Sequence, residues 1–201
     1  MRVRHSALVR LTHWTTAASF IALVVSGIAI LLAHPRLYWG ETGALGTPSL
    51  VDLPLPMVLT GQSGWGRYLH FLSAWVCVLA GAAYLLGGMA AGHFRNDLFH
   101  PTHPAKYDPV QRVTYIAVVF VLFPLMIWTG FAMSPALTSV FPWFVIALGG
   151  QQSARTVHFI VANLLVLFVV GHVVMVALAG FGRHVGAMVL GGEPLVRERR
   201  T

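Results

Sequence analysis

The chain has 201 residues, of which 57% are hydrophobic and only 9% are Asp, Glu, Lys or Arg. A water-soluble domain carries about 25% charged residues, so this sequence has too few polar side chains to cover a surface in water. The composition excludes a soluble globular domain, a disordered tail and a nucleic-acid-binding protein, although the net charge is +7. The single cysteine, Cys77, also excludes an intramolecular disulfide and a cysteine-ligated metal cluster.

Four long stretches without charged residues predict four membrane-spanning helices. They contain 25, 27, 42 and 27 residues, and a spanning helix needs about 20. We expect an all-α, integral membrane four-helix bundle that forms one domain over residues 1–201, with spans at about 9–33, 67–91, 111–133 and 155–181. The longest stretch also contains an apolar run at 141–148. This run is too short to cross, and we expect it to be interfacial or re-entrant.

The basic residues predict that both termini lie in the cytoplasm. In that orientation ten Lys and Arg side chains face the inner side, and three, Arg36, Arg67 and Arg155, face the outer side. An excess of Lys and Arg on the cytoplasmic side is the asymmetry expected of an inner-membrane protein. A fifth span would place the basic C-terminal tail on the outer side, against this rule. The first apolar run is too long for a signal peptide, so we expect it to remain as the first span. The main outer loop then covers 35–66 and the main inner loop 92–108.

Histidine is unusually frequent, with ten residues in this apolar chain. Ionisable groups inside a span are costly and mark functional sites. Four histidines fall within the predicted spans: His13, His70, His158 and His172. The other six are expected to be interfacial or solvated: His5, His34, His93, His100, His103 and His184. Three of those six lie close together in the inner loop, but they lack the partner set of a metal site.

The fourth span carries two of the histidines, His158 and His172, fourteen residues apart. At about 100° and 1.5 Å per residue, both imidazoles point within about 40° of one face and lie about 21 Å apart. The orientation of the spans places His70 at the outer level with His158, and His13 at the inner level with His172. Two opposed imidazole pairs fit the axial ligands of two low-spin b-type haems. Zinc is less suited, because each pair would lack the remaining ligands.

Three candidate ligands stand three positions after an arginine: His13 after Arg10, His70 after Arg67, and His158 after Arg155. Positions i and i+3 share a helix face, so these guanidinium groups are candidates to bind haem propionates. Anchoring in lipid headgroups is the alternative. Gly27 lies fourteen residues beyond the first-span histidine, at the level of the outer haem. Its missing side chain would let a porphyrin edge approach the backbone, with helix–helix packing as the alternative.

The motifs resemble the bacterial di-haem cytochrome b family. That family includes membrane subunits of formate dehydrogenase, nickel–iron hydrogenase and thiosulfate reductase, and stand-alone cytochrome b561 proteins. The matching stretches are Arg10-Leu-Thr-His13-Trp14, Tyr68-Leu-His70-Phe71, Tyr107-Asp-Pro-Val-Gln111-Arg112 and the two histidines of the fourth span. The resemblance covers nearly the whole chain. It implies two b-type haems, the same histidine pairing, and a multi-pass protein of the bacterial inner membrane.

The resemblance also implies electron transfer between the quinone pool and a periplasmic redox partner, such as a molybdopterin oxidoreductase or a c-type cytochrome. We expect an electron-transfer subunit, because the sequence shows no soluble catalytic domain. The quinone is expected at the inner end of the third span, beside Asp108 and Gln111. Related formate dehydrogenase subunits have an Asn at the position of Asp108. Asp108-Pro109 also fits a helix N-cap followed by proline.

Three other functions remain open at this point. One is a stand-alone superoxide:quinone oxidoreductase, as some relatives suggest. The second is a structural anchor whose haems do not turn over, and the third is a proton or metal transporter with a histidine relay. The sequence also leaves open a homodimer.

Overall fold

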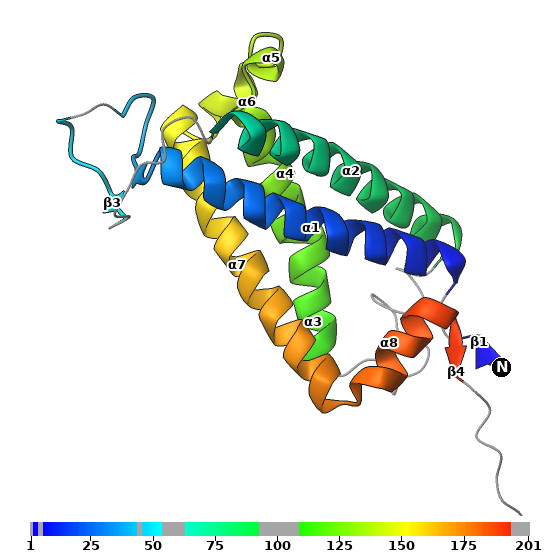
Figure 1. Cartoon of the computed structure of the whole chain (residues 1–201). Coiled ribbons are helices and arrows are strands. Elements are labelled where there is room, and N and C mark those ends of the chain that lie inside the picture. The colour runs from blue at the N-terminus through cyan, green and yellow to red at the C-terminus, as the bar shows by residue number, and fades with distance from the viewer. Residues whose placement is uncertain (1, 4–5, 44–45, 54–62, 93–108, 194–201) are drawn as a thin grey trace, which may run out of the picture. The chain divides into compact units, whose positions relative to one another are not determined.

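The computed structural model describes residues 2–3, 6–43, 46–53, 63–92 and 109–193, and helices form most of this part of the chain (Figure 1). The helices are α1 (Ala7–Ala33), α2 (Ser63–Ala90), α3 (Pro109–Ala117), the π-helix η2 (Val118–Leu122), α4 (Phe123–Ala132), α5 (Pro135–Thr138), α6 (Trp143–Ile146), α7 (Gln151–Leu178) and α8 (Phe181–Leu190). Two antiparallel strand pairs join β1 (Arg2–Val3) to β4 (Gly192–Glu193) and β2 (Arg36–Leu37) to β3 (Val51–Asp52).

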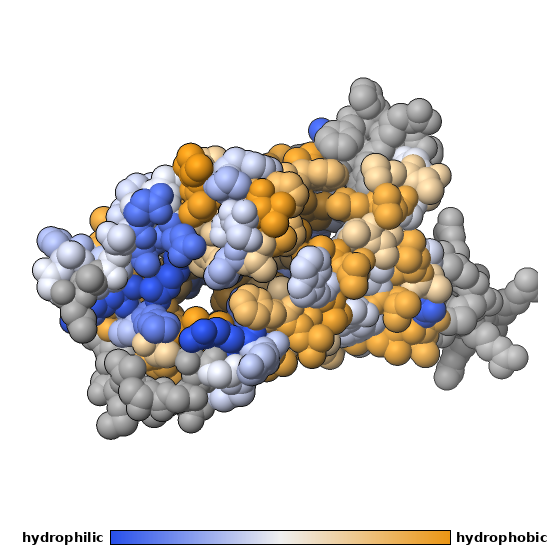
Figure 2. All heavy atoms as spheres, turned by 90° about the horizontal axis from the view of Figure 1, so that it is seen from above, coloured by the Kyte–Doolittle hydropathy of each residue, from blue (hydrophilic) through white to orange (hydrophobic). Residues whose placement is uncertain are grey.

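Four helical segments are long and apolar enough to cross a membrane: Ala7–Ala33, Gly64–Ala90, Gln111–Ala132 and Gln151–Leu178. Only 11–17% of each segment's most apolar window is buried within the protein. Figure 2 shows apolar residues over much of the visible face. Apolar side chains that face outward require a lipid environment. The four predicted spans are therefore confirmed, with helix ends within a few residues of the expected positions.

The third span is one continuous helical segment with a change of pitch. Its π-turn, η2, ends at Leu122, two residues before Pro124, and the Phe123 amide donates to the Val118 carbonyl. Proline has no amide hydrogen to donate and crowds the preceding turn, and a π-turn is one way in which a helix accommodates this. The span ends at Met133, and Ser134 is extended before Pro135 (φ −89°, ψ 111°). This serine–proline pair therefore ends the third span.

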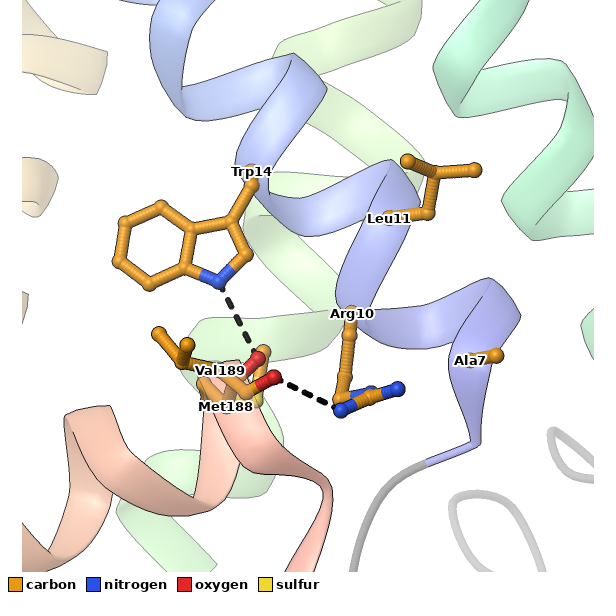
Figure 3. Close-up of a pocket in the computed structure, with 6 residues that line it drawn as sticks. All are labelled: Ala7, Arg10, Leu11, Trp14, Met188 and Val189. Atoms are coloured by element: carbon orange, nitrogen blue, oxygen red, sulfur yellow. Dashed lines mark hydrogen bonds between the residues drawn. The ribbon is translucent and has the colours of Figure 1, made fainter.

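The chain divides into two compact units, of which the first contains residues 1–27, 65–102 and 170–201. Within it, the left-handed Gly180 (φ 107°) separates α7 from α8, an element that the charge pattern did not predict. Arg10 and Trp14 of α1 donate hydrogen bonds to the carbonyls of Val189 and Met188, at 2.8 and 3.1 Å (Figure 3). The last carbonyls of a helix lack partners within the helix. These two side chains therefore complete the end of α8.

The second unit contains residues 28–64 and 103–169. In it, the start of the predicted outer loop is tied to the first turns of α7. The Gly40 carbonyl accepts the amides of Gln152 and Ser153 at 3.0 and 3.3 Å. Thr156 donates to the Tyr38 carbonyl at 2.6 Å, and Arg155 donates to the His34 carbonyl. The Gly40 carbonyl thus supplies an acceptor to two amides of the first helical turn that have none within the helix, and the other two bonds are donated by side chains of α7.

The apolar run at 141–148 forms the single-turn helix α6, which packs on α4 within the second unit. Trp128 of α4 donates its indole N–H to the Phe144 carbonyl at 3.1 Å. The rings of Trp143 and Phe144 stack with centroids 4.0 Å apart. The run therefore does not cross the membrane, in agreement with its length.

Candidate haem-binding sites

His13 on α1 and His172 near the end of α7 lie close together in the first unit. Their ring centroids are 6.4 Å apart, and the ring planes are inclined by 57°. Two imidazoles on opposite sides of one iron have centroids about 6 Å apart, because a metal–nitrogen bond is about 2 Å long and the nitrogen lies about 1 Å from the ring centre. Trp14 meets His13 edge-on at 5.2 Å. The separation of the two imidazoles fits a bis-histidine haem.

His70 on α2 contacts a hydroxyl group from α1 in the same unit. The Ser26 Oγ lies 3.0 Å from His70 Nδ1, and Ser26 is fully buried. The same oxygen donates to the Ala22 carbonyl, at 2.7 Å. A Cβ atom placed on Gly27 would lie 3.7 Å from His70 Cε1, at van der Waals contact. Gly27 therefore faces the His70 imidazole, and its missing side chain leaves room beside that ring.

His158 on α7 has a matching environment in the second unit. The Thr129 Oγ1 of α4 lies 2.8 Å from His158 Nδ1, and Thr129 is fully buried. Its hydroxyl also donates to the Leu125 carbonyl at 2.9 Å. A Cβ atom on Gly130 would lie 3.8 Å from His158 Cε1. We call Ser26-Gly27 and Thr129-Gly130 the two hydroxyl–glycine pairs.

Gly27 was predicted from the sequence, whereas Ser26, Thr129 and Gly130 were not. A signal was present, because a hydroxyl residue followed by glycine occurs within two predicted spans. Hydroxyl side chains are common in membrane helices, where they bond to the carbonyl one turn earlier. The pattern therefore becomes informative only when the contact with an imidazole is seen.

The three candidate propionate ligands occupy different environments. Arg10 is half-buried and lines a pocket of about 580 Å³ with Trp14 and four apolar residues (Figure 3). Its Nε is buried with no hydrogen-bond partner among the described residues, so it retains a donor for an anion. Arg155 is half-buried and bonded to the His34 carbonyl, and Arg67 is exposed at the start of α2. Their binding to propionates stays a prediction.

The predicted quinone residues are only partly described. Gln111 is exposed in the first turns of α3, which begins at Pro109, and Asp108 lies outside the described residues. His93, His100 and His103 also lie outside them. Within the described part of the chain, no three His, Cys, Asp or Glu side chains are grouped closely enough to hold a metal ion.

Four apolar spans, three of which carry the four imidazoles, are the features of a membrane-embedded cytochrome of the b type. The chain belongs to the prokaryotic cytochrome b561 family, whose model matches residues 4–191. It is accordingly a multi-pass protein of the bacterial inner membrane that binds b-type haem and transfers electrons. No solved structure matches the chain.

Three relatives show how this chain compares with other members. A protein of Azospira oryzae, named "Putative protein-methionine-sulfoxide reductase subunit YedZ1", is 28% identical over 198 residues, which cover 87% of this chain and 90% of the relative. The "Probable Ni/Fe-hydrogenase B-type cytochrome subunit" of Cupriavidus necator is 23% identical, covering 84% and 76%. The "Putative cytochrome YdhU" of Escherichia coli is 29% identical, covering 84% and 65%.

Proposed function

We propose that this protein holds two b-type haems and transfers electrons between a membrane quinone and a redox partner on the periplasmic side. His13 and His172 ligate the inner haem, and His70 and His158 ligate the outer haem. The observation that carries the proposal is the 6.4 Å separation of the His13 and His172 rings, which suits one iron between them. When bound, haem supplies the one-electron chemistry, and the protein supplies ligation, spacing and a dry environment.

The residues of this chain have distinct tasks in that function. His158 and His172 stand on the single helix α7, which sets the two ligand levels about 21 Å apart. The apolar spans exclude water from both levels. Arg10 offers its unpaired Nε–H to a carboxylate at the inner level. The spacing of the two histidines along one helix thus sets the proposed distance between the haem levels.

The partner is proposed from the relatives and from exposed aromatic residues. Two relatives are named as subunits, one of a protein-methionine-sulfoxide reductase and one of a Ni/Fe-hydrogenase. We infer that this chain also serves an oxidoreductase, with a c-type cytochrome as the alternative partner. Trp39, Phe141 and Trp143 are 59%, 48% and 53% exposed and are available for docking. Tyr38 is buried and is therefore not part of such a surface.

The quinone is proposed to bind beside the inner haem, at the start of the third span. A quinone needs hydrogen-bond partners for its carbonyl oxygens, and the exposed Gln111 can donate one. Asp108 would connect that site to protons in the cytoplasm.

A spectrum of the purified protein tests the proposal. Reduced-minus-oxidised difference spectra and haem quantitation should give two b haems per chain, both reducible by a quinol analogue. The His184→Ala variant should retain both haems, because this side chain lies on α8 near the Gly180 carbonyl. One haem per chain, or two haems that no quinol reduces, would contradict the proposal.

A further inference from the structure

We propose that Ser26 and Thr129 are positioning residues, which hold Nδ1 of His70 and His158 and thereby direct Nε2 of each imidazole toward the outer haem iron. The inference rests on the proposed ligation and deepens it. It concerns two side chains that touch the ligands and not the haem. Their hydroxyl groups come from α1 and α4, whereas the imidazoles come from α2 and α7.

The two contacts share the same geometry. Each hydroxyl oxygen lies within 3.0 Å of Nδ1, and each belongs to a residue with 0% exposure. In a dry site such a bond is not weakened by competition from water. Each imidazole is therefore restrained both in its ring orientation and in the nitrogen that it can offer to a metal. Ligation through Nε2 is the arrangement that leaves both contacts intact.

The hydrogen atoms can be assigned by counting donors. A backbone carbonyl only accepts, and a hydroxyl has a single hydrogen. The Ser26 hydroxyl donates to the Ala22 carbonyl at 2.7 Å, and the Thr129 hydroxyl donates to the Leu125 carbonyl at 2.9 Å. Each oxygen then accepts a hydrogen bond from Nδ1–H. A neutral imidazole with its hydrogen on Nδ1 has its lone pair on Nε2, which is the form that binds a metal.

The glycine of each hydroxyl–glycine pair makes the contact sterically acceptable. A Cβ atom on Gly27 or Gly130 would touch Cε1, the ring carbon between the two nitrogens, at 3.7 or 3.8 Å. Alanine therefore fits at van der Waals distance, whereas a longer side chain would displace the ring. The hydroxyl holds one edge of the imidazole, and the glycine leaves space beside it.

Hydrogen bonds to the second nitrogen of a metal-bound imidazole raise its basicity and stabilise the oxidised metal. Ser26→Ala and Thr129→Val remove the acceptor with little change of volume. In the purified holoprotein, we expect the midpoint potential of the outer haem to rise and its low-spin EPR signal to shift. Loss of an outer-shell partner typically weakens metal binding by about 10–100-fold, so the outer haem should also be lost more readily.

Two further sets of variants make the test specific. Ser26→Thr and Thr129→Ser keep a hydroxyl and should restore the potential and the EPR signal. Thr12→Val is the matched control, because the Thr12 hydroxyl is buried and bonds to the Leu8 carbonyl of its own helix at 2.8 Å. It should leave the outer haem unchanged. If Thr129→Val does not accumulate in the membrane, the Ser26→Ala variant decides the question.

The possible failures are distinguishable. If Ser26→Ala and Thr129→Val leave the potential and the EPR signal of the outer haem unaltered, the positioning role is wrong while the proposed ligation stands. If His70→Ala and His158→Ala retain two full haems, the ligation fails and the positioning role fails with it.

Discussion

The two halves of the proposed ligand set are held in different ways. His13 and His172 are exposed side chains whose rings approach each other to 6.4 Å, with Trp14 at the edge of one ring. His70 and His158 are half-buried, and each contacts a buried hydroxyl of a neighbouring helix at Nδ1. The described contacts thus join the imidazoles to each other in the first pair, and join each imidazole to a buried hydroxyl of a neighbouring helix in the second.

The largest expected effect is the loss of one haem from each histidine variant. His13→Ala or His172→Ala should remove the inner haem and spare much of the outer one, because the remaining imidazole cannot complete the axial pair. His70→Ala or His158→Ala should do the reverse. Pyridine haemochrome quantitation would detect the change, with His184→Ala as the control. A full complement of haem in any of the four variants would sink the assignment.

The second expected effect comes from bulky side chains that displace the outer pair of imidazoles, His70 and His158, and leave the inner pair unchanged. Gly27→Leu and Gly130→Leu should displace the imidazole that each glycine faces, and so lower occupancy of the outer haem alone. Gly27→Ala and Gly130→Ala should retain it, because a Cβ atom meets Cε1 at 3.7 and 3.8 Å. Redox titration monitored by absorbance distinguishes the two haems. An unaltered outer haem in both leucine variants would show that the glycines are ordinary packing residues.

The third expected effect is on quinone binding at the proposed site beside the inner haem. Gln111→Ala should weaken inhibition by a quinone analogue by about tenfold, which corresponds to the loss of one hydrogen bond of about 1.4 kcal/mol. Haem content should not change. Gln151→Ala is the matched control, since this glutamine is also exposed near the start of a span. Equal inhibitor sensitivity in both variants, together with normal quinone kinetics for Asp108→Asn, would place the quinone elsewhere.

The smallest effect is on stability. Trp14→Phe removes the indole N–H that donates to the Met188 carbonyl at 3.1 Å, which should cost about 1 kcal/mol of the free energy of unfolding. Thermal unfolding in detergent would measure it as a slight decrease in Tm with both haems retained. Trp39→Phe is the control, because this exposed side chain lies outside the first unit. A Tm unchanged from that control would mean that the bond to α8 contributes nothing measurable.

The spans were predictable because charged side chains are excluded from the membrane interior. The absence of charge along a stretch of sequence can be read without knowing how the helices pack against each other. The π-turn before Pro124 and the short helix α8 were not predicted, since each depends on local backbone hydrogen bonding that hydropathy does not register. The candidate ligands were found as ionisable residues in apolar helices. Ser26 and Thr129 were missed because a buried hydroxyl has the same sequence pattern whether or not an imidazole lies beside it.

The continuity of α7 restricts how the length of this chain can vary. His158 and His172 belong to one uninterrupted helix, Gln151–Leu178. A single residue inserted between them would turn one imidazole by about 100° relative to the other and remove it from its partner. Seven inserted residues would nearly restore the direction but would add about 10 Å to the separation. We therefore expect an insertion or deletion between these two histidines to cost one haem, whereas a change of length in a loop leaves the phase of α7 unchanged.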